Sequence, residues 1–237
     1  MMELQAIQYG ADGLNFTGFL ADGSNGEPSP GVLLIHESGG LVDHTKTRAA
    51  RLGELGYVAF AMDLYGEPIS GLEGARAINR ALVADISRLR DRCRAALATL
   101  AAQPGTDPDR LAAIGYCFGG AAAIELARDG AGLACVAGFH SGFIDSPPPE
   151  DDRAIRGKLL ICQGAEDPVI TAGQRDAFLA RMTAAGIDWQ LHLYGGVGHS
   201  FTNPGIDAWN LPGFAYDARA DRRSWTAMLA LFEEVFA

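Results

Sequence analysis

The chain has 237 residues, of which 48% are hydrophobic, and its 19 basic and 29 acidic residues give a formal net charge of −10 at pH 7. An acidic surface repels phosphate backbones and anionic lipid headgroups, which argues against nucleic-acid and membrane partners. No segment approaches the roughly twenty apolar residues that a membrane-spanning helix needs. The length suits one domain covering residues 1–237. Four widely spaced cysteines without a CxxC pair are typical of free thiols, so we expect a cytoplasmic protein.

Short apolar segments alternate with helical ones along the chain. Two alternating segments around a central Asp-Gly predict a hairpin, Leu4–Tyr9 and Leu14–Leu20. The later strands are apolar without alternation, as expected of strands covered on both faces: Val32–Ile35, Tyr57–Met62, Leu111–Tyr116, Leu133–Phe139, Lys158–Cys162 and Trp189–Tyr194. Helical patterns lie between and after them: His44–Leu55, Glu73–Ala102, Gly119–Arg128, Gln174–Ala185 and Asp217–Phe236. This order predicts an α/β fold, with a mostly parallel sheet of about eight strands, helices on both faces and an N-terminal antiparallel hairpin.

Functional sites in such sheets form beyond the carboxyl ends of the strands. There the sequence places Gly115-x-Cys117-x-Gly119, between an apolar strand and an alanine-rich helix. This is the pattern of a nucleophile elbow with cysteine in place of serine, and the flanking glycines relieve collisions in its strained turn. A helix N-terminus also favours the thiolate. We therefore predict that Cys117 is a nucleophile; a buried structural cysteine in a glycine-rich turn is the alternative.

An acid and a histidine follow at later strand ends, in the order nucleophile, acid, histidine. Asp167 comes after the strand at Lys158–Cys162, and His199 lies in a glycine-rich loop after the last strand. Each residue alone could belong to an ordinary turn or loop. Together with Cys117 they predict a Cys117–His199–Asp167 triad.

The strand at Val32–Ile35 ends in His-Glu-Ser-Gly-Gly, where enzymes with such an elbow place a second oxyanion donor. We predict that the Ser38 N–H pairs with the N–H of Phe118, the residue after the nucleophile. Glu37 is unexpected, because a carboxylate beside an oxyanion is unfavourable unless it has another task. That task could be to hold the Cys117 proton in the resting state, or to steer the histidine or a water; an exposed strand-end glutamate is the alternative.

These motifs resemble the dienelactone hydrolase family over nearly the whole chain: Gly115-Tyr116-Cys117-Phe118-Gly119-Gly120, His36-Glu37, Asp167 followed by Val169, and His199-Ser200-Phe201. The resemblance implies an α/β-hydrolase fold and a carboxymethylenebutenolidase-like activity. Such an enzyme is a carboxylic ester hydrolase that opens an enol-lactone through an acyl-enzyme, with no metal and no organic cofactor. It also implies that Glu37 interacts with the resting cysteine until substrate frees the thiol.

The chain departs from the family in one respect. Family members that act on dienelactone bind its carboxylate with arginines, one of them four residues after the catalytic histidine, and here that position is Asn203. Arg76 or Arg80 could supply the other arginine. The resemblance therefore extends to the family's catalytic residues, but it does not imply the family's specificity for dienelactone.

Further residues at strand ends or in the loop after the histidine are candidate substrate contacts: His140, Tyr65, Phe201, Asn203 and Trp209. A structural role at the strand end is the alternative for His140. The loop Thr202–Ala215 is long and rich in proline and aromatic residues, which makes it a candidate lid.

We expect a hydrolase of small esters or lactones that acts as a monomer or small homo-oligomer on a small-molecule substrate. A thioesterase or acyltransferase on the same fold is one alternative. A non-catalytic protein that binds small molecules is the other. A metal site is not expected, because His36, His44 and His192 lack the spacing and the acidic partners of metal ligands.

Overall fold

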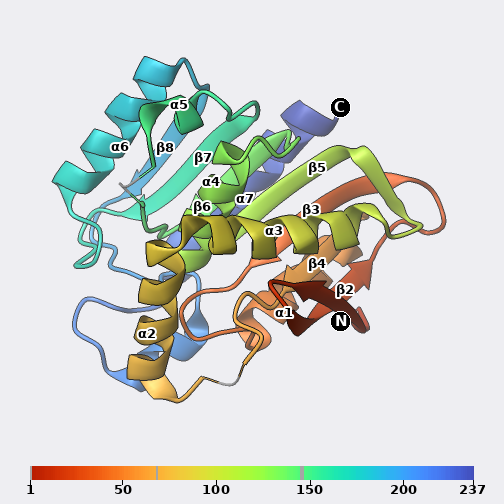
Figure 1. The fold of residues 1–237 in the computed structure, drawn as a ribbon. Helices are drawn as coiled ribbons and strands as arrows, with labels where there is room; N and C mark the ends of the chain where they lie inside the picture. Colours follow the sequence, from red (N-terminus) through yellow and green to blue (C-terminus); the bar gives the residue numbers. More distant parts are fainter. Residues whose placement is uncertain (1, 68, 145–146) are drawn as a thin grey trace. The chain divides into compact units, whose positions relative to one another are not determined.

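The computed structural model describes residues 2–67, 69–144 and 147–237 (Figure 1). Their contacts group into two compact units, residues 1–114 and 115–237. The organisation of the chain as one domain stays a prediction.

The first unit is built on a hairpin and two buried parallel strands. Strands β1 (Gln5–Ala11) and β2 (Leu14–Asp22) pair antiparallel, as predicted, and β2 also pairs antiparallel with β4 (Val58–Met62). Strand β3 (Ser29–Ile35) pairs parallel with β4, in a register that places Ile35 beside Met62. Every residue of β4 and the last five of β3 are buried, which explains their unbroken apolar sequence. Strand β5 (Thr106–Tyr116) runs from this unit into the next.

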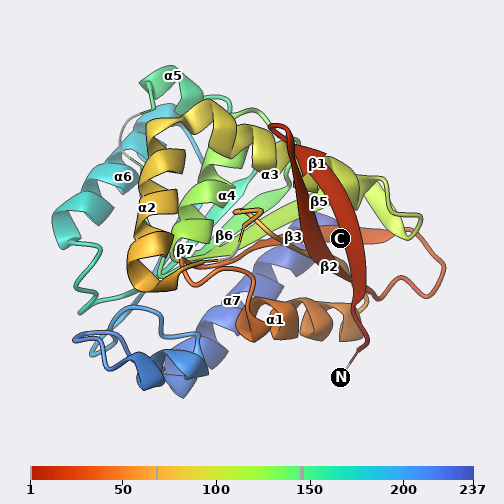
Figure 2. The ribbon, with the colours of Figure 1, turned by 60° about the horizontal axis from the view of Figure 1, so that its bottom comes forward.

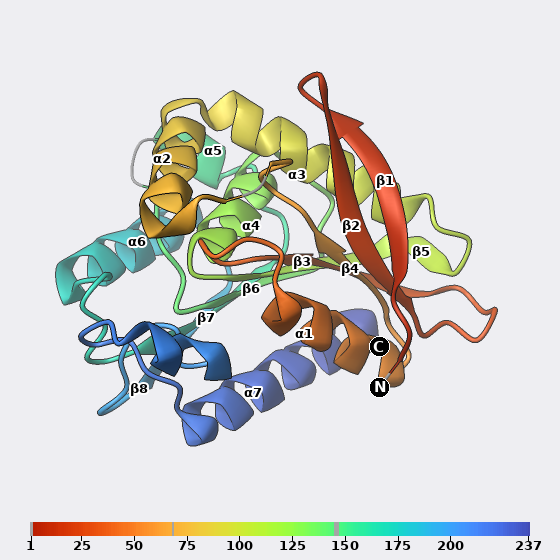
Figure 3. The same ribbon diagram turned by 90° about the horizontal axis from the view of Figure 1, so that it is seen from below.

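Helices cover both faces of these strands. Helix α1 (Asp43–Glu54) packs on β2 and β4, whereas α3 (Ile86–Ala101) packs on β1 and β3 from the opposite face (Figure 3). The prediction of one continuous helix over residues 73–102 is wrong, because α2 (Gly71–Ala84) and α3 are separate. Asp85 between them has a non-helical φ of −125°, and its side chain accepts the Arg88 N–H and caps α3.

The second unit has three parallel strands, β6 (Cys135–Phe139), β7 (Lys158–Gly164) and β8 (Trp189–Tyr194). Helices α4 (Phe118–Arg128) and α7 (Ala218–Phe236) lie on opposite faces of β6 (Figure 2). Helix α6 (Ala172–Ala185) packs on β8 and begins with a capping box formed by Thr171 and Gln174. A short helix α5 (Pro149–Asp152) and a 3₁₀ helix η1 (Pro204–Trp209) complete the unit.

The predicted fold class is confirmed. The described residues form eight strands; β3 pairs parallel with β4, and β6, β7 and β8 pair parallel, whereas the N-terminal hairpin and its pairing with β4 are antiparallel. Helices lie on both faces of each unit's strands. Of the helices in the described part of the chain, none combines the length and apolar character that a membrane span requires.

Candidate active site

Cys117 occupies a sharp turn between β5 and α4. Its φ of 53° and ψ of −117° belong to a conformation that residues other than glycine rarely adopt. Three backbone hydrogen bonds hold the turn: the Cys117 N–H donates to Phe139 O at 3.0 Å, and the Cys117 carbonyl accepts from the N–H groups of Gly120 and Gly142. The strained turn predicted for the nucleophile is therefore present, and neighbouring backbone fixes it.

The glycine before the turn is required sterically. A Cβ atom at Gly115 would lie 2.1 Å from the carbonyl oxygen of Gly119, which is backbone and cannot rotate away. A Cβ at Gly120 would lie 2.4 Å from Ser141 Oγ. The steric reason predicted for glycine at position 115 is confirmed.

Asp167 and His199 form a buried pair in the same unit. Asp167 follows β7 and His199 follows β8, and His199 Nδ1 lies 2.6 Å from Asp167 Oδ2. The other carboxylate oxygen, Oδ1, accepts the backbone N–H groups of Val169 and Ile170 at 2.8 and 3.0 Å. One oxygen thus fixes the loop and the other orients the histidine, as a triad acid does.

The environment of His199 favours its protonated form. Burial lowers the pKa of His199, but the charge of Cys117, the hydrogen bonds to Asp167 and Cys117, and the charge of Asp167 together outweigh burial and raise the pKa to about 10. The two groups that raise the pKa of His199, the Asp167 carboxylate and the Cys117 sulfur, both belong to the second unit.

The loop after His199 is tied to the histidine itself. The His199 N–H donates to Gly213 O at 2.9 Å, the Ala215 N–H donates to His199 O at 3.2 Å, and the ring of Phe214 lies 4.8 Å from the His199 ring. The far end of the candidate lid therefore belongs to the scaffold that positions the imidazole.

The predicted substrate contacts in this unit have structural partners. His140 is fully buried at the end of β6, where its Nε2 lies 2.8 Å from Thr202 Oγ1 and its ring 5.1 Å from that of His199. Phe201 is also fully buried and packs edge-on against His140. Asn203 caps η1 by accepting the Gly205 N–H, and Trp209 ends that helix with 49% of its surface exposed. Contact of these residues with a substrate stays a prediction.

Glu37, in the first unit, is not exposed. Its side chain is only 7% accessible, and Oε1 lies 3.3 Å from Nδ1 of His44 at the start of α1. The alternative interpretation as an exposed strand-end glutamate is therefore wrong. Its interaction with the nucleophile stays a prediction.

Tyr65 and a residue that the sequence did not single out surround Ser38. The Tyr65 hydroxyl donates to Asn79 Oδ1 at 2.6 Å, and the Asn79 amide donates to Ser38 Oγ at 2.8 Å. Asn79 lies in α2, an alanine-rich helix with no motif around it. Only its position as a weak helix former within such a helix could have drawn attention to it.

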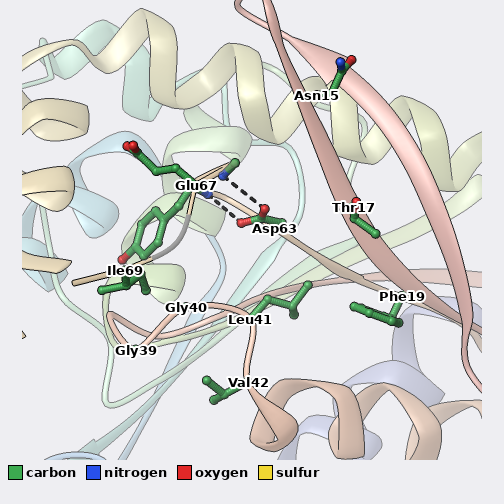
Figure 4. Close-up of a pocket in the computed structure, with 12 residues that line it drawn as sticks. Asn15, Thr17, Phe19, Gly39, Gly40, Leu41, Val42, Asp63, Glu67 and Ile69 are labelled. Atoms are coloured by element: carbon green, nitrogen blue, oxygen red, sulfur yellow. Dashed lines mark hydrogen bonds between the residues drawn. The ribbon is translucent and has the colours of Figure 1, made fainter. Parts of the chain in front are cut away.

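A pocket of about 520 Å³ lies in the first unit, bordered by β2 and by the loops after β3 and β4 (Figure 4). Asp63 on its wall is held by the N–H groups of Tyr65 and Gly66. The described residues that line it include Asp63 and Glu67 but neither lysine nor arginine. Of the two arginines considered for a carboxylate clamp, Arg76 pairs with Glu73 on the exposed face of α2, and Arg80 is exposed.

The sequence and the structure were compared with protein families and with solved structures. Residues 16–236 match the model of the dienelactone hydrolase family. A solved structure called m3DLH is 45% identical, with a TM-score of 0.95, and the match covers 100% of this chain and 99% of that one. The dienelactone hydrolase-like promiscuous phosphotriesterase P91 from metagenomic libraries is 37% identical, with a TM-score of 0.95 and coverage of 99% and 98%.

Among curated proteins, the carboxymethylenebutenolidase of Pseudomonas sp. strain P51 is 31% identical over 191 residues, which cover 73% of this chain and 74% of that protein. The predicted enzyme class, a carboxylic ester hydrolase, is confirmed. The chain belongs to the dienelactone hydrolase family.

Proposed function

We propose that this enzyme hydrolyses small esters and lactones through an acyl-enzyme on Cys117, with His199 and Asp167 as its partners. One observation carries the proposal: His199 is held by Asp167 at 2.6 Å, and its pKa is raised by the charge of Cys117. An imidazole placed between a carboxylate and a sulfur is the arrangement that activates a cysteine nucleophile.

Acylation begins from the sulfur anion beside the His199 imidazolium. The sulfur adds to the carbonyl carbon, and the carbonyl oxygen becomes an oxyanion that accepts hydrogen bonds from the N–H groups of Ser38 and Phe118. The bond from carbon to the leaving oxygen then breaks, and His199 gives its Nε2 proton to that oxygen. The products of this half-reaction are a thioester on Cys117 and a free alcohol or enol, which stays attached to the acyl chain when the substrate is a lactone.

Deacylation follows from the same charges. Forming the thioester removes the negative charge of the sulfur, which is the main cause that raises the pKa of His199. The pKa of His199 therefore falls, and the neutral imidazole can take a proton from water. The resulting hydroxide adds to the thioester, the carbon–sulfur bond breaks, and the thiolate is restored as the carboxylic acid leaves.

Glu37 is proposed to restrain the resting thiol, as the family resemblance implies. His44 supports this role, because it lies 3.3 Å from the Glu37 carboxylate and the side chain of each is nearly buried. A carboxylate with a fixed partner holds one orientation, which a restraining group requires.

The substrate class follows from the leaving group and from charge. A thiolate transfers activated acyl groups well, and an amide nitrogen leaves poorly, so esters, lactones and thioesters are favoured over peptides. Asn203 occupies the position of a carboxylate-binding arginine and caps a helix instead. We therefore propose neutral esters and lactones rather than anionic dienelactones.

Phosphotriesters are a second candidate substrate class. The observation that favours them is the 37% identity and the TM-score of 0.95 to the phosphotriesterase P91. Hydrolysis of a neutral phosphotriester would use the same sulfur attack, with displacement at phosphorus in place of carbon.

We also propose a reducing, cytoplasmic location, because Cys117 and the three buried cysteines are all free thiols.

The test replaces Cys117 by alanine and compares turnover of p-nitrophenyl acetate, of lactones with and without a carboxylate, and of paraoxon. Glu54→Gln at the end of α1 serves as a control variant on the surface of the first unit. We expect Cys117→Ala to lose all turnover with an unchanged circular dichroism spectrum, and neutral lactones to be preferred by the wild type. Full ester turnover by Cys117→Ala would show that the nucleophile has been misassigned.

A further inference from the structure

The direction of the Ser38 N–H is set by the carbonyl on the other side of the same peptide group. That carbonyl belongs to Glu37, and it accepts two hydrogen bonds, from His36 Nδ1 at 2.8 Å and from the Gly40 N–H at 3.0 Å. The described chain contains no cis peptide bond, so the N–H of this group points opposite to its carbonyl. Fixing the carbonyl therefore aims the Ser38 N–H.

Nδ1 of a neutral His36 can donate in only one tautomer, and the backbone selects that tautomer. The Leu64 N–H donates to His36 Nε2 at 3.0 Å, so Nε2 carries the lone pair and Nδ1 carries the hydrogen. His36 is fully buried, and its ring lies edge-on to that of Tyr65 at 4.7 Å. The donor that holds the Glu37 carbonyl is thus itself fixed by the loop after β4.

The side chain of Ser38 is held independently from α2. Asn79 donates to Ser38 Oγ at 2.8 Å, and the hydroxyl of the buried Tyr65 both fixes Asn79 at 2.6 Å and lies 3.4 Å from the Ser38 carbonyl oxygen. Tyr65 is anchored in turn, since its N–H donates to Asp63 and its carbonyl accepts from Arg92. A chain of hydrogen bonds therefore leads from a rigid loop through Asn79 to Ser38.

We propose that Asn79 and Tyr65 are positioning residues for the oxyanion-stabilising N–H of Ser38. They act through the Ser38 side chain, while His36 holds the opposite end of the peptide group. This inference rests on the proposed function, because it gives a role to a network that acts only if Ser38 donates to the oxyanion. Neither residue reacts; both keep the donor aligned before substrate arrives, which is how such donors contribute to rate.

The test separates oxyanion stabilisation from thiolate reactivity. Acylation by p-nitrophenyl acetate forms an oxyanion, whereas alkylation of Cys117 by iodoacetamide displaces iodide and forms none. We compare both rate constants in Asn79→Ala, Ser38→Ala, the double variant, and Tyr65→Phe, which removes only a hydroxyl. Glu73→Ala, on the exposed face of the same helix, is the matched control.

We expect Asn79→Ala and Ser38→Ala each to slow acylation by about tenfold, less than the roughly 100-fold or greater loss on removing an oxyanion donor, because the Ser38 N–H remains. Alkylation should stay within twofold of the wild type. The double variant should be no slower than either single variant, because both remove the same hydrogen bond. Tyr65→Phe should slow acylation in the same way.

Equal losses in acylation and alkylation, additive losses in the double variant, or unchanged acylation in Asn79→Ala and Tyr65→Phe would each overturn the inference. A failure of the proposed function looks different. In that case Cys117→Ala, or the wild type alkylated at Cys117, would keep its ester turnover whatever the Asn79 variants do.

Discussion

Replacing Asp167 by asparagine should disable the histidine without disturbing the loop that carries it. The two carboxylate oxygens have different partners: Oδ1 accepts the N–H groups of Val169 and Ile170, and Oδ2 accepts from His199 Nδ1. An asparagine has one oxygen, and only that oxygen can accept the two backbone N–H groups. Its NH₂ group must then face His199, donor against donor.

His199 can avoid this clash between two donors only by changing its tautomer. Nδ1 becomes the acceptor and Nε2 carries the hydrogen, so Nε2 can no longer take a proton from water. Loss of a hydrogen bond to a charged group costs about 1.5–3 kcal/mol. Loss of the active tautomer reduces the rate further, because Nε2 can no longer act as a base. The same substitution in serine triads lowers kcat by about 10⁴. We expect a loss of about 10³ to 10⁴ in kcat/KM for p-nitrophenyl acetate.

The assay is initial-rate hydrolysis at pH 7, with circular dichroism and thermal melting to check the fold. Glu166→Gln is the matched control, because this exposed neighbour undergoes the same change of charge and should stay within twofold. Asp167→Ala should lose activity and also melt at a lower temperature, since it removes the anchors of the loop as well. Activity of Asp167→Asn within tenfold of the wild type would refute the assignment of this carboxylate as the triad acid.

Three further results are expected. Gly115→Ala should destabilise the fold by about 3 kcal/mol or more, measured by urea unfolding, because its Cβ would lie 2.1 Å from Gly119 O; wild-type stability would contradict the steric argument. Iodoacetamide should label Cys117 well before the three buried cysteines, as peptide mass spectrometry would show, and uniform labelling would contradict this. Since the pKa of His199 is raised from 6.5 to about 10, the stability it contributes is complete below pH 6.5 and is lost as pH rises through 10. The urea midpoint should fall across that range, and less in Cys117→Ala; an equal fall in both proteins would contradict the role of the sulfur charge.

The order of strands and helices could be predicted from the sequence because apolar segments and glycine turns carry it. The errors lie where polar side chains decide the local structure. Asp85 ends one helix and caps the next, although the surrounding pattern remains helical. Strand β5 begins at Thr106 rather than Leu111, since its first residues are polar and include a proline. Asn203 starts a 3₁₀ helix in a segment that was predicted as a loop.

The residues of the candidate site divide in the same way. Asp167 and His199 could be predicted because each follows a recognisable strand within a glycine-rich or turn-forming segment. Asn79 could not, because its significance arises from a hydrogen bond to Ser38, 41 residues away in the sequence. Contacts of this kind depend on how α2 packs, and no local pattern encodes them.

The backbone at Cys117 has a consequence for the balance between stability and activity. A residue other than glycine in this conformation costs about 1–3 kcal/mol, whereas glycine adopts it freely and loses about 0.5–1 kcal/mol of chain entropy on folding. Cys117→Gly should therefore be inactive and yet more stable than the wild type, by about 1 kcal/mol in urea unfolding. The backbone conformation of Cys117 therefore costs stability at the position of the proposed nucleophile, which is the trade-off expected where a strained residue serves activity.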